Sequence, residues 1–465
     1  MLKLIIMKEL KEIIGSPKFV YSFAVCSILI ILTFYAGAKN YQVNKQQYDA
    51  SVAANIRSMS GVTDWRMVNH KIFLPPQPLA SLVSGVSNDI GRNIEMYGRG
   101  ELIPTDSKFN EDPIYAVFRF LDLNFLFQII LSLFAILFCY NAVNGEKERG
   151  TLRLIFSNAI PRDKFILGKI IGSSLGLSLP LLIPFLIGSL LLMIMNIPVS
   201  GQDWIKLMLI VLTGILLFTV FINLSVFVST ITKIPSNSFL LLLVAWIFFV
   251  LVIPKASVLI AGRAVDVPSV DEINTKKNKY SQQLSKEHFG KLNGFKAPQG
   301  GDMMAEFTKY MEKINKERDE KMRSFAGKLN TERRNRQDIQ KNLAFALSRI
   351  SPSASYSFIA SSMAGSSLLL EKDYRDQADN YQKSFAKFQE EKTGMATGGG
   401  MMIYISNGDE KPPEINPNEI PKFDFKPAPA IQSLGASLFD IGLLLVFNLL
   451  FFAGSYLRFL KFDLR

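Results

Sequence analysis

Residues 144–154 read Asn-Gly-Glu-Lys-Glu-Arg-Gly-Thr-Leu-Arg-Leu, and residues 160–169 read Ile-Pro-Arg-Asp-Lys-Phe-Ile-Leu-Gly-Lys. This dense cluster of charges separates two strongly apolar segments of the chain. A short charged hairpin between two membrane spans is a place where a membrane protein can contact a soluble partner. The hairpin therefore raises two questions: where the spans lie, and which side of the membrane the hairpin faces.

The composition is that of a protein embedded in lipid. Of the 465 residues, 49% are hydrophobic, and Phe alone occurs 36 times. The net charge is +12, but most basic residues flank apolar runs, which favours membrane orientation over nucleic-acid binding. Cys26 and Cys139 lie inside apolar runs and are expected to be buried, while His70 and His288 are far apart. We therefore expect neither a metal site nor a catalytic centre.

Six apolar runs are long enough to cross a bilayer, which takes about 20 residues in a helix. None of them alternates between apolar and polar residues as a barrel strand does. We therefore expect an all-α membrane protein with six transmembrane helices. The predicted spans are residues 19–37, 123–143, 165–195, 205–229, 239–261 and 433–456.

The basic residues of the short loops predict the orientation of these spans. Lys and Arg precede the first span, fill the hairpin and follow the last span, and six spans place them all on one side. We expect a bacterial inner-membrane protein with both termini in the cytoplasm and residues 40–118 and 263–430 outside. Ala36-Gly-Ala38 is similar to a signal-peptidase site, but the long charged leader and long apolar run favour an uncleaved first span.

The predicted domains are an interfacial helix over 1–17, spans over 18–262, an external domain over 263–430, and a last span with its tail over 431–465. Residues 1–17 carry one apolar helical stripe and lysines elsewhere, which is typical of an amphipathic helix on the inner membrane face. Ser16-Pro17 would turn this helix into the first span.

The external domain is predicted to be mostly helical. Residues 270–296, 302–350 and 373–392 favour helices, and the first two form either a packed hairpin or solvated charged helices. Ser351-Pro-Ser is expected to end one helix and cap the next. We expect residues 354–370 at the outer membrane face, a short helix after the Pro-rich turn at 73–81, a strand at 401–405 and an extended linker over 411–430.

The phosphate-binding loop of ATPases does not occur in the sequence, because Asp163 stands where Gly168-Lys169 would need a glycine. We therefore do not expect the chain to hydrolyse ATP. The hairpin itself resembles the signature of ABC-2-type transporter permeases. The residues that carry this resemblance are Glu146, Glu148, Gly150, Thr151, Leu152, Pro161, Arg162 and Lys169.

The six-span plan with an interfacial helix resembles the same family. Residues 75–81, 121–124, 253–254 and 351–353 resemble its subgroup with a large external insertion. The resemblance implies half of an exporter, in which two permeases pair as a homodimer or heterodimer. A separate cytoplasmic ABC ATPase would bind each permease at 144–165 and would hold the ATP and Mg, so no cofactor is expected in this chain.

The residue types of the hairpin agree with such a contact. Glu146 and Glu148 would project from a short rigid element, and Gly150 permits a tight turn. Thr151 would cap the helix 152–158, and Pro161-Arg162 would re-enter the bilayer. The alternative is an anchoring loop that needs only positive charge, which would not require paired glutamates.

Polar residues in the spans leave two interpretations open. Asn124, Asn223, Asp440 and Asn448 either line a pathway or join neighbouring helices by hydrogen bonds. Asp440 lies near the outer end and is expected to be partly hydrated. Pro180 and Pro184 in the third span either bend during transport or simply kink the helix.

Two functions remain open at this point. In the first, a separate ATPase drives the chain to move a lipophilic or amphipathic substrate outward. In the second, hydrolysis inside moves the external domain, which acts on an envelope protein without carrying a solute. A membrane scaffold without an ATPase would not need the hairpin signature. The pathway residues are generic apolar ones and do not name a substrate.

Overall fold

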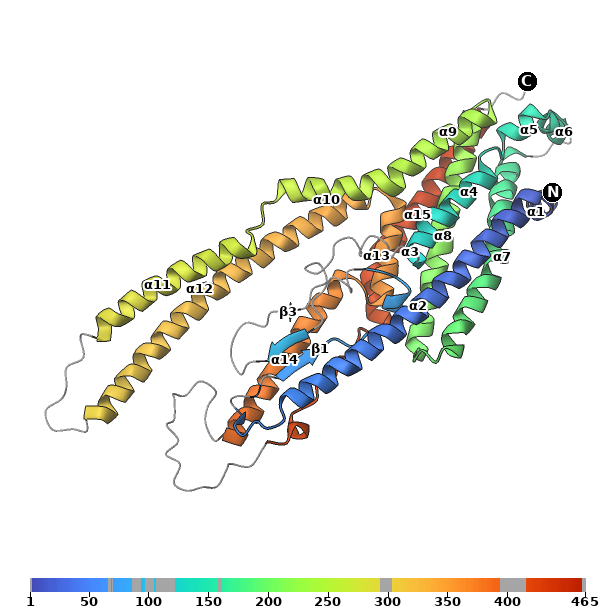
Figure 1. Ribbon diagram of the computed structural model, residues 1–465. Helices are drawn as coiled ribbons and strands as arrows, with labels where there is room; N and C mark the ends of the chain where they lie inside the picture. Colours follow the sequence, from blue (N-terminus) through green and yellow to red (C-terminus); the bar gives the residue numbers. More distant parts are fainter. Residues whose placement is uncertain are drawn as a thin grey trace. The chain divides into compact units, whose positions relative to one another are not determined.

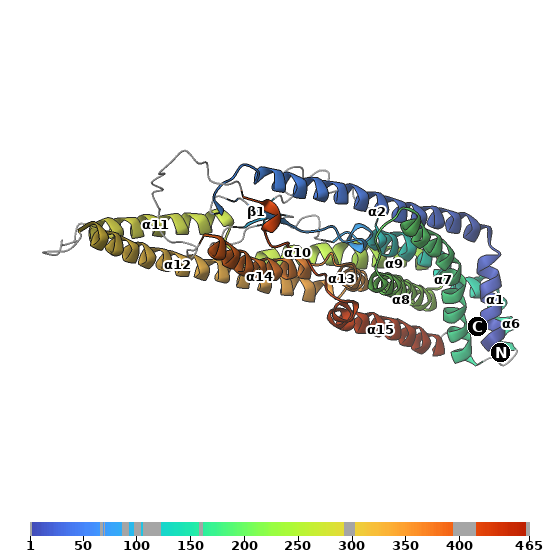
Figure 2. The ribbon, with the colours of Figure 1, turned by 90° about the horizontal axis from the view of Figure 1, so that it is seen from below.

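The computed structural model describes residues 2–65, 68, 70–85, 93–96, 104–105, 122–157, 161–292, 303–393 and 415–461. The chain forms two compact units, one of residues 1–252, 349–399 and 406–465, the other of 253–348 and 400–405. The boundaries differ from the predicted domains, because residues 349–399 belong with the membrane spans. Figures 1 and 2 show the elements from two directions.

Among the described residues, six helical segments are long and apolar enough to cross a membrane, which confirms the predicted spans and the all-α class. They are α2 (Pro17–Ser58), Leu123–Glu148, α7 (Arg162–Ile194), α8 (Gly201–Ile231), Pro235–Ala264 and α15 (Ala430–Leu460). The first is much longer than predicted. Its 42 residues extend about 60 Å, roughly twice the hydrocarbon thickness. The helix continues past residue 37 to Ser58, and Gly61, at φ +80°, lies in the turn that follows it.

Spans two and five each contain a π-helical turn, which widens the helix locally. Span two consists of α3 (Leu123–Phe125), the π turn η6 (Leu126–Leu131), α4 (Ser132–Cys139) and α5 (Asn144–Glu148). Span five consists of α9 (Pro235–Trp246), the π turn η7 (Ile247–Val252) and α10 (Ile253–Ala264). The Trp246 indole donates to the Ser132 hydroxyl at 2.7 Å, so the two irregular spans are joined.

The second unit contains the predicted helical hairpin. Its long helices are α11 (Val270–Leu292) and α12 (Met303–Ser348). The rings of Tyr280 and Phe325 stack with centroids 4.1 Å apart, and Ile314 is buried. The seam between these helices is therefore packed rather than solvated. The strand predicted at 401–405 lies outside the described residues.

Helix α13 (Pro352–Ala364) packs on the membrane spans. The Ser351 hydroxyl accepts from the Ala354 amide at 3.4 Å, so the predicted cap is present. Tyr356, Ile359 and Met363 are buried in the same core as α8. The Ser and Ala residues of α13 allow close helix packing, and Figure 2 shows α13 beside α8 and α15. Low hydropathy here reflects burial among helices.

A second core contains a small antiparallel sheet that was not expected. The strands are β1 (His70–Phe73), β2 (Asn93–Met96) and β3 (Pro104–Thr105), in the order β1-β2-β3 with His70 opposite Met96. The predicted short helix after the Pro-rich turn is the 3₁₀ turn η2 (Leu79–Ser81). Helix α14 (Leu368–Thr393) packs on this core. The described part of the predicted linker, from residue 415 on, contains the 3₁₀ turn η8 (Pro417–Glu419) before α15 begins.

His70 is held neutral within this second core. The Tyr381 hydroxyl donates to the Pro421 carbonyl at 2.6 Å, so the His70 Nε2–H donates to Tyr381 at 2.8 Å. The other ring nitrogen, Nδ1, then accepts from the Asn55 amide at 3.3 Å. Burial lowers the pKa of His70 to about 4. If the ring were protonated, the His70 Nδ1–H would face the N–H of the Asn55 amide group, and two donors would meet.

The spans define two ends of the bundle. The hairpin of residues 144–157 and the last turn of α15 lie at one end, which we call the hairpin end, as Figure 1 shows. Helix α8 begins at the other end, after α7 has crossed the bundle. Helix α15 begins there too, because the Lys206 ammonium donates to the Ala428 carbonyl at 2.8 Å.

Candidate functional site

The hairpin contains two short helices joined by a tight turn. Helix α5 ends at Glu148, and α6 (Thr151–Ser157) begins three residues later. Gly150 has φ +73° and donates its amide to the Lys147 carbonyl at 3.0 Å, so the predicted glycine turn is present. The Thr151 hydroxyl, expected to cap α6, donates instead to the Glu146 carbonyl at 3.1 Å. Thr151 therefore ties α6 back to α5.

A small hydrophobic core fixes the hairpin to two spans. Leu152 is only 2% exposed and packs with Phe165 and Phe459. The Phe156 ring lies 5.4 Å from the Phe165 ring between centroids. Arg162 donates to the Phe459 carbonyl at 3.3 Å and also to the Leu460 carbonyl, which satisfies open carbonyls at the end of α15. Pro161 precedes α7 as its N-cap, as the re-entry prediction requires.

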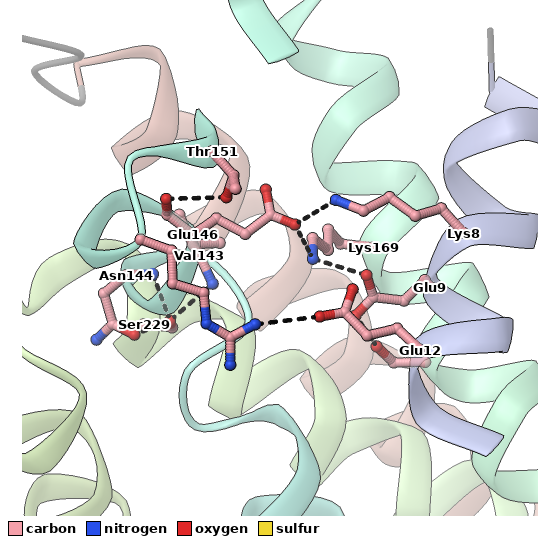
Figure 3. A network of polar contacts seen from close by, with 11 residues as sticks. Lys8, Glu9, Glu12, Val143, Asn144, Glu146, Thr151, Lys169 and Ser229 are labelled. Atoms are coloured by element: carbon pink, nitrogen blue, oxygen red, sulfur yellow. Dashed lines mark hydrogen bonds and ion pairs between the residues drawn. The ribbon is translucent and has the colours of Figure 1, made fainter. Parts of the chain in front are cut away.

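Buried hydrogen bonds fix the start of the hairpin to the end of α8. The Ser229 hydroxyl accepts from the Val143 and Asn144 amides at 3.0 and 3.2 Å. It donates to the Asn144 side-chain oxygen at 3.0 Å, and the Asn144 amide group donates to Thr232 at 2.9 Å. Figure 3 shows the Ser229 contacts. A movement of the hairpin would therefore act on α8 as well as on α7.

A buried ion cluster joins the hairpin to α1 (Leu2–Ile14) and α7, as Figure 3 shows. The Lys169 ammonium lies 2.6 Å from the Glu9 carboxylate and 2.6 Å from the Glu146 carboxylate. The side chains of Lys169, Glu9 and Glu146 are 5%, 9% and 9% exposed. The Lys8 ammonium adds a contact to Glu146 at 3.1 Å from the more exposed side.

Glu146 therefore does not project from the hairpin as the sequence suggested. Its carboxylate points toward α1 and α7, while Glu148 and Arg149 are exposed. One of its oxygens, Oε2, has no hydrogen-bond partner among the described residues. Arg149 reaches back to Glu12 of α1 at 3.4 Å, which gives a second and more exposed link between the hairpin and that helix.

A row of glycines on α7 brings α1 close enough to bury these charges. A Cβ atom added at Gly172 would lie 2.7 Å from the Glu9 Cβ, and one at Gly168 would lie 2.7 Å from Ile5. Gly176, one turn further, faces Ile13 at 3.6 Å. Small residues at four-residue spacing let helix backbones approach closely. The predicted interfacial helix therefore packs on a span through its apolar stripe.

The charges of the cluster suit an ion network better than a metal site. The carboxylate oxygens of Glu9, Glu12 and Glu146 lie within 4.8 Å of one another, a spacing that a cation could bridge. The Lys169 ammonium already contacts two of these three carboxylates at hydrogen-bond distance. Burial raises the pKa of the Glu9 carboxyl, and the nearby Lys169 opposes that shift. Lysine is thus the cation of this site.

Sequence reasoning missed the partners of Lys169. Glu9 stands four residues from Ile5 and from Ile13, so a charge interrupts the apolar stripe. Gly168, Gly172 and Gly176 share the same spacing next to Lys169. A charged residue on one stripe and a lysine beside a row of glycines were the signals that could have paired the two helices.

Two of the polar residues predicted in the spans join helices. The Asn223 amide group donates to the Asn448 side-chain oxygen at 2.8 Å, between α8 and α15. Asn448 donates in turn to the Leu216 carbonyl at 3.2 Å. This geometry favours helix–helix hydrogen bonding over a pathway role for both residues. Among the described residues, the Asn124 amide group donates to the Ser84 carbonyl at a long 3.5 Å.

Asp440 was expected to be partly hydrated, but the structure shows it buried. It is 2% exposed and accepts two hydrogen bonds from Arg349, at 2.6 and 3.0 Å. The Arg349 guanidinium also lies 4.9 Å from the centre of the Phe439 ring. Pro180 and Pro184 lie within one continuous helix, α7, and Pro184 is buried. The structure thus offers no break in this span.

The model of the ABC-2 family transporter protein matches residues 4–464, which include α1, the hairpin and all six spans. No curated protein matches the sequence. The chain therefore belongs to the ABC-2 family of transporter proteins, as a multi-pass transmembrane subunit.

Proposed function

We propose that the chain is the permease subunit of an ATP-driven exporter that moves a lipophilic or amphipathic substrate outward. A separate cytoplasmic ATPase binds the hairpin, and a second permease completes the pathway. Family membership supports the transporter role. The observation that carries the coupling role is the buried cluster of Glu9, Glu146 and Lys169, because it joins the hairpin to two helices.

The hairpin has a different role on each face. Its outward face offers Glu148, Arg149 and Leu154, whose side chain is 68% exposed, to the ATPase. Its inward face holds Glu146 against Lys169. Binding on the outward face would therefore pull on α1 and α7 through the cluster. Charged contacts buried between helices resist shear better than apolar contacts, since a broken pair leaves an uncompensated charge.

The hairpin end is assigned to the cytoplasm of a bacterial inner membrane. Lysines of α1, the basic hairpin and Arg458 of the last turn of α15 all belong to that end. The positive-inside rule places such residues in the cytoplasm. Both termini then lie inside, together with the ATPase and its ATP and Mg.

Association with the ATPase tests this proposal. The chain is purified in lipid with the ATPase that accompanies it, and binding and stimulated hydrolysis are measured. Glu148→Ala combined with Leu154→Ala should weaken association by about tenfold or more, as loss of central contacts does. Asp376→Ala, an exposed carboxylate on α14, is the matched control and should change neither quantity. Unchanged association in the double variant would refute the assigned contact.

A second function is favoured by one observation at span five. The hydroxyls of Ser351 and Ser353 both donate to the Phe249 carbonyl, within the π turn η7, Ser353 at 3.1 Å. The helical arm of residues 253–348 follows this turn directly in the chain, and Ser351 and Ser353 come just after its end. We propose, as the alternative, that a change in this turn moves the arm, which acts on an envelope protein without solute transport.

Replacing the arm separates the two functions. Arg333 donates to the Pro268 carbonyl at 3.0 Å, so a short Gly-Ser loop in place of residues 269–332 joins points that already touch. The packed residues 349–393 stay intact. Export that persists in this variant supports the permease and rules out transmission through the arm. The variant can also lose the function of the chain in cells while the purified complex in lipid still hydrolyses ATP and exports. That result supports transmission through the arm.

A further inference from the structure

A cavity of about 270 Å³ lies within the first unit at the opposite end of the bundle from the hairpin. It is enclosed by the first turns of α8 and α15, the end of α13, the start of α14 and residues 425–428. Its charged lining consists of Lys206, Asp203 and Asp373. A drug-sized ligand takes about 300–1,000 Å³, so this cavity suits a smaller polar group.

Lys206 is the unusual residue of this cavity. It is only 6% exposed, and its ammonium has one hydrogen bond, to the neutral Ala428 carbonyl at 2.8 Å. In the described part of the chain, no carboxylate lies within ion-pair distance of it. A buried charge is costly unless another charge compensates it. Asp203, three residues earlier on α8, interacts with Lys206 electrostatically but forms no ion pair with it, so an anionic group in the cavity would complete the compensation.

The two carboxylates give the cavity a second preference. Asp203 accepts from the Ser200 amide and hydroxyl at 3.0 and 2.7 Å, which fixes its position at the start of α8. Asp373, on α14, has no ion-pair partner among the described residues. Two carboxylates would repel a simple anion, whereas a simple cation would leave Lys206 uncompensated. A ligand that carries both charges satisfies the whole lining.

The surroundings of the cavity are apolar and face outward. Ile205 and Met208 on α8 are 55% and 70% exposed, and Ile431 on α15 is 85% exposed. These side chains belong to the first three turns of two spans, where a bilayer interface is expected. Acyl chains packed along them would leave a lipid headgroup at the level of the cavity.

We propose that this cavity binds the headgroup of a zwitterionic aminophospholipid. Lys206 pairs with the phosphate, while Asp203 and Asp373 receive the ammonium group. The site is independent of the hairpin and of the ATPase, so it stands whether or not the proposed coupling holds. It would hold a lipid at the start of α8 and α15, about 25 Å along α8 from the Asn223–Asn448 contact.

Native mass spectrometry of the full chain in detergent tests the site. Dissociation constants are measured for short-chain phosphatidylethanolamine, phosphatidylglycerol and soluble phosphoethanolamine. Lys206→Met should weaken binding of both lipids by about tenfold or more, since each loses its charged hydrogen bond. Asp373→Asn should weaken phosphatidylethanolamine by about threefold or more while sparing phosphatidylglycerol, because only the ammonium contact is lost.

The control is Asp376→Asn, an exposed carboxylate one turn along α14 that does not line the cavity, and it should change no affinity. Equal binding of phosphatidylethanolamine by the wild type and by Lys206→Met would overturn the proposal. Displacement of the lipid by soluble phosphoethanolamine at a similar concentration would overturn the lipid as the source of the group. If Lys206→Met does not fold, the lipid preference of Asp373→Asn decides the question.

Discussion

Replacing Lys169 by methionine should destabilise the protein severely. The substitution keeps the length of the side chain but removes the one cation that lies 2.6 Å from both Glu9 and Glu146. Two carboxylates, each 9% exposed, then face each other, and the only cation left beside them in the described residues is the half-exposed Lys8, 3.1 Å from Glu146. Breaking a buried pair in this way costs about 3–5 kcal/mol. The ratio of folded to unfolded protein should therefore fall by a factor on the order of 10² to 10³.

The cost should come from the orphaned charges, and a triple variant isolates that cause. In Lys169→Met with Glu9→Gln and Glu146→Gln no charge is left unpaired, so most of the lost stability should return. Equilibrium unfolding in mixed detergent micelles, followed by tryptophan fluorescence, measures all variants. Orphaned charges are not the cause if Lys169→Met alone lowers the free energy of unfolding by less than about 1 kcal/mol. They are not the cause either if the triple variant is as unstable as the single one.

Three further predictions concern other contacts. Gly172→Ala should cost about 1–3 kcal/mol in the same unfolding assay, because its Cβ would meet Glu9 at 2.7 Å, whereas Gly435→Ala on α15 meets nothing within 4 Å and should be nearly neutral. Asn223→Leu and Asn448→Leu should show a coupling of about 0.5–2 kcal/mol in a double-mutant cycle, and full stability with lost export would assign them to a pathway instead. In the folded protein the pKa of His70 is about 4, below its ordinary value of 6.5. As the pH falls, the unfolded chain therefore binds this proton first. The free energy of unfolding should decrease by about 3 kcal/mol between pH 6.5 and pH 4. Trp65 fluorescence reports on this core, and His70→Gln should flatten the pH dependence; an unchanged profile would contradict the assignment.

The long elements were predictable from the sequence because their signals are local. Six apolar runs, the charged helix α12 and the capped start of α13 each carry their pattern within a few turns. The sheet was not predictable, since its strands have four, four and two residues. The packing of α13 on α8 was not predicted, because Ser and Ala give the helix low hydropathy, although that composition also suits close packing in a helical core.

The candidate site was predictable only in part. The turn at Gly150 and the re-entry at Pro161 are local features, and the sequence located both. The burial of Glu146 depends on Glu9, which is 137 positions earlier, and on the approach of α1 to α7. No local pattern around residue 146 distinguishes a carboxylate that faces a partner from one that faces a neighbouring helix.

We propose that Glu146 links the hairpin to α1 and α7 without touching the ATPase. Glu146→Gln keeps the shape of the side chain and leaves the pair of Lys169 and Glu9 in place. The most direct measurement compares affinity for the ATPase with stimulated hydrolysis in lipid, for this variant and the wild type. We predict that the affinity of Glu146→Gln for the ATPase stays within about twofold of wild type, while stimulation of ATP hydrolysis falls by about tenfold or more. Loss of affinity, or full stimulation, would contradict this prediction.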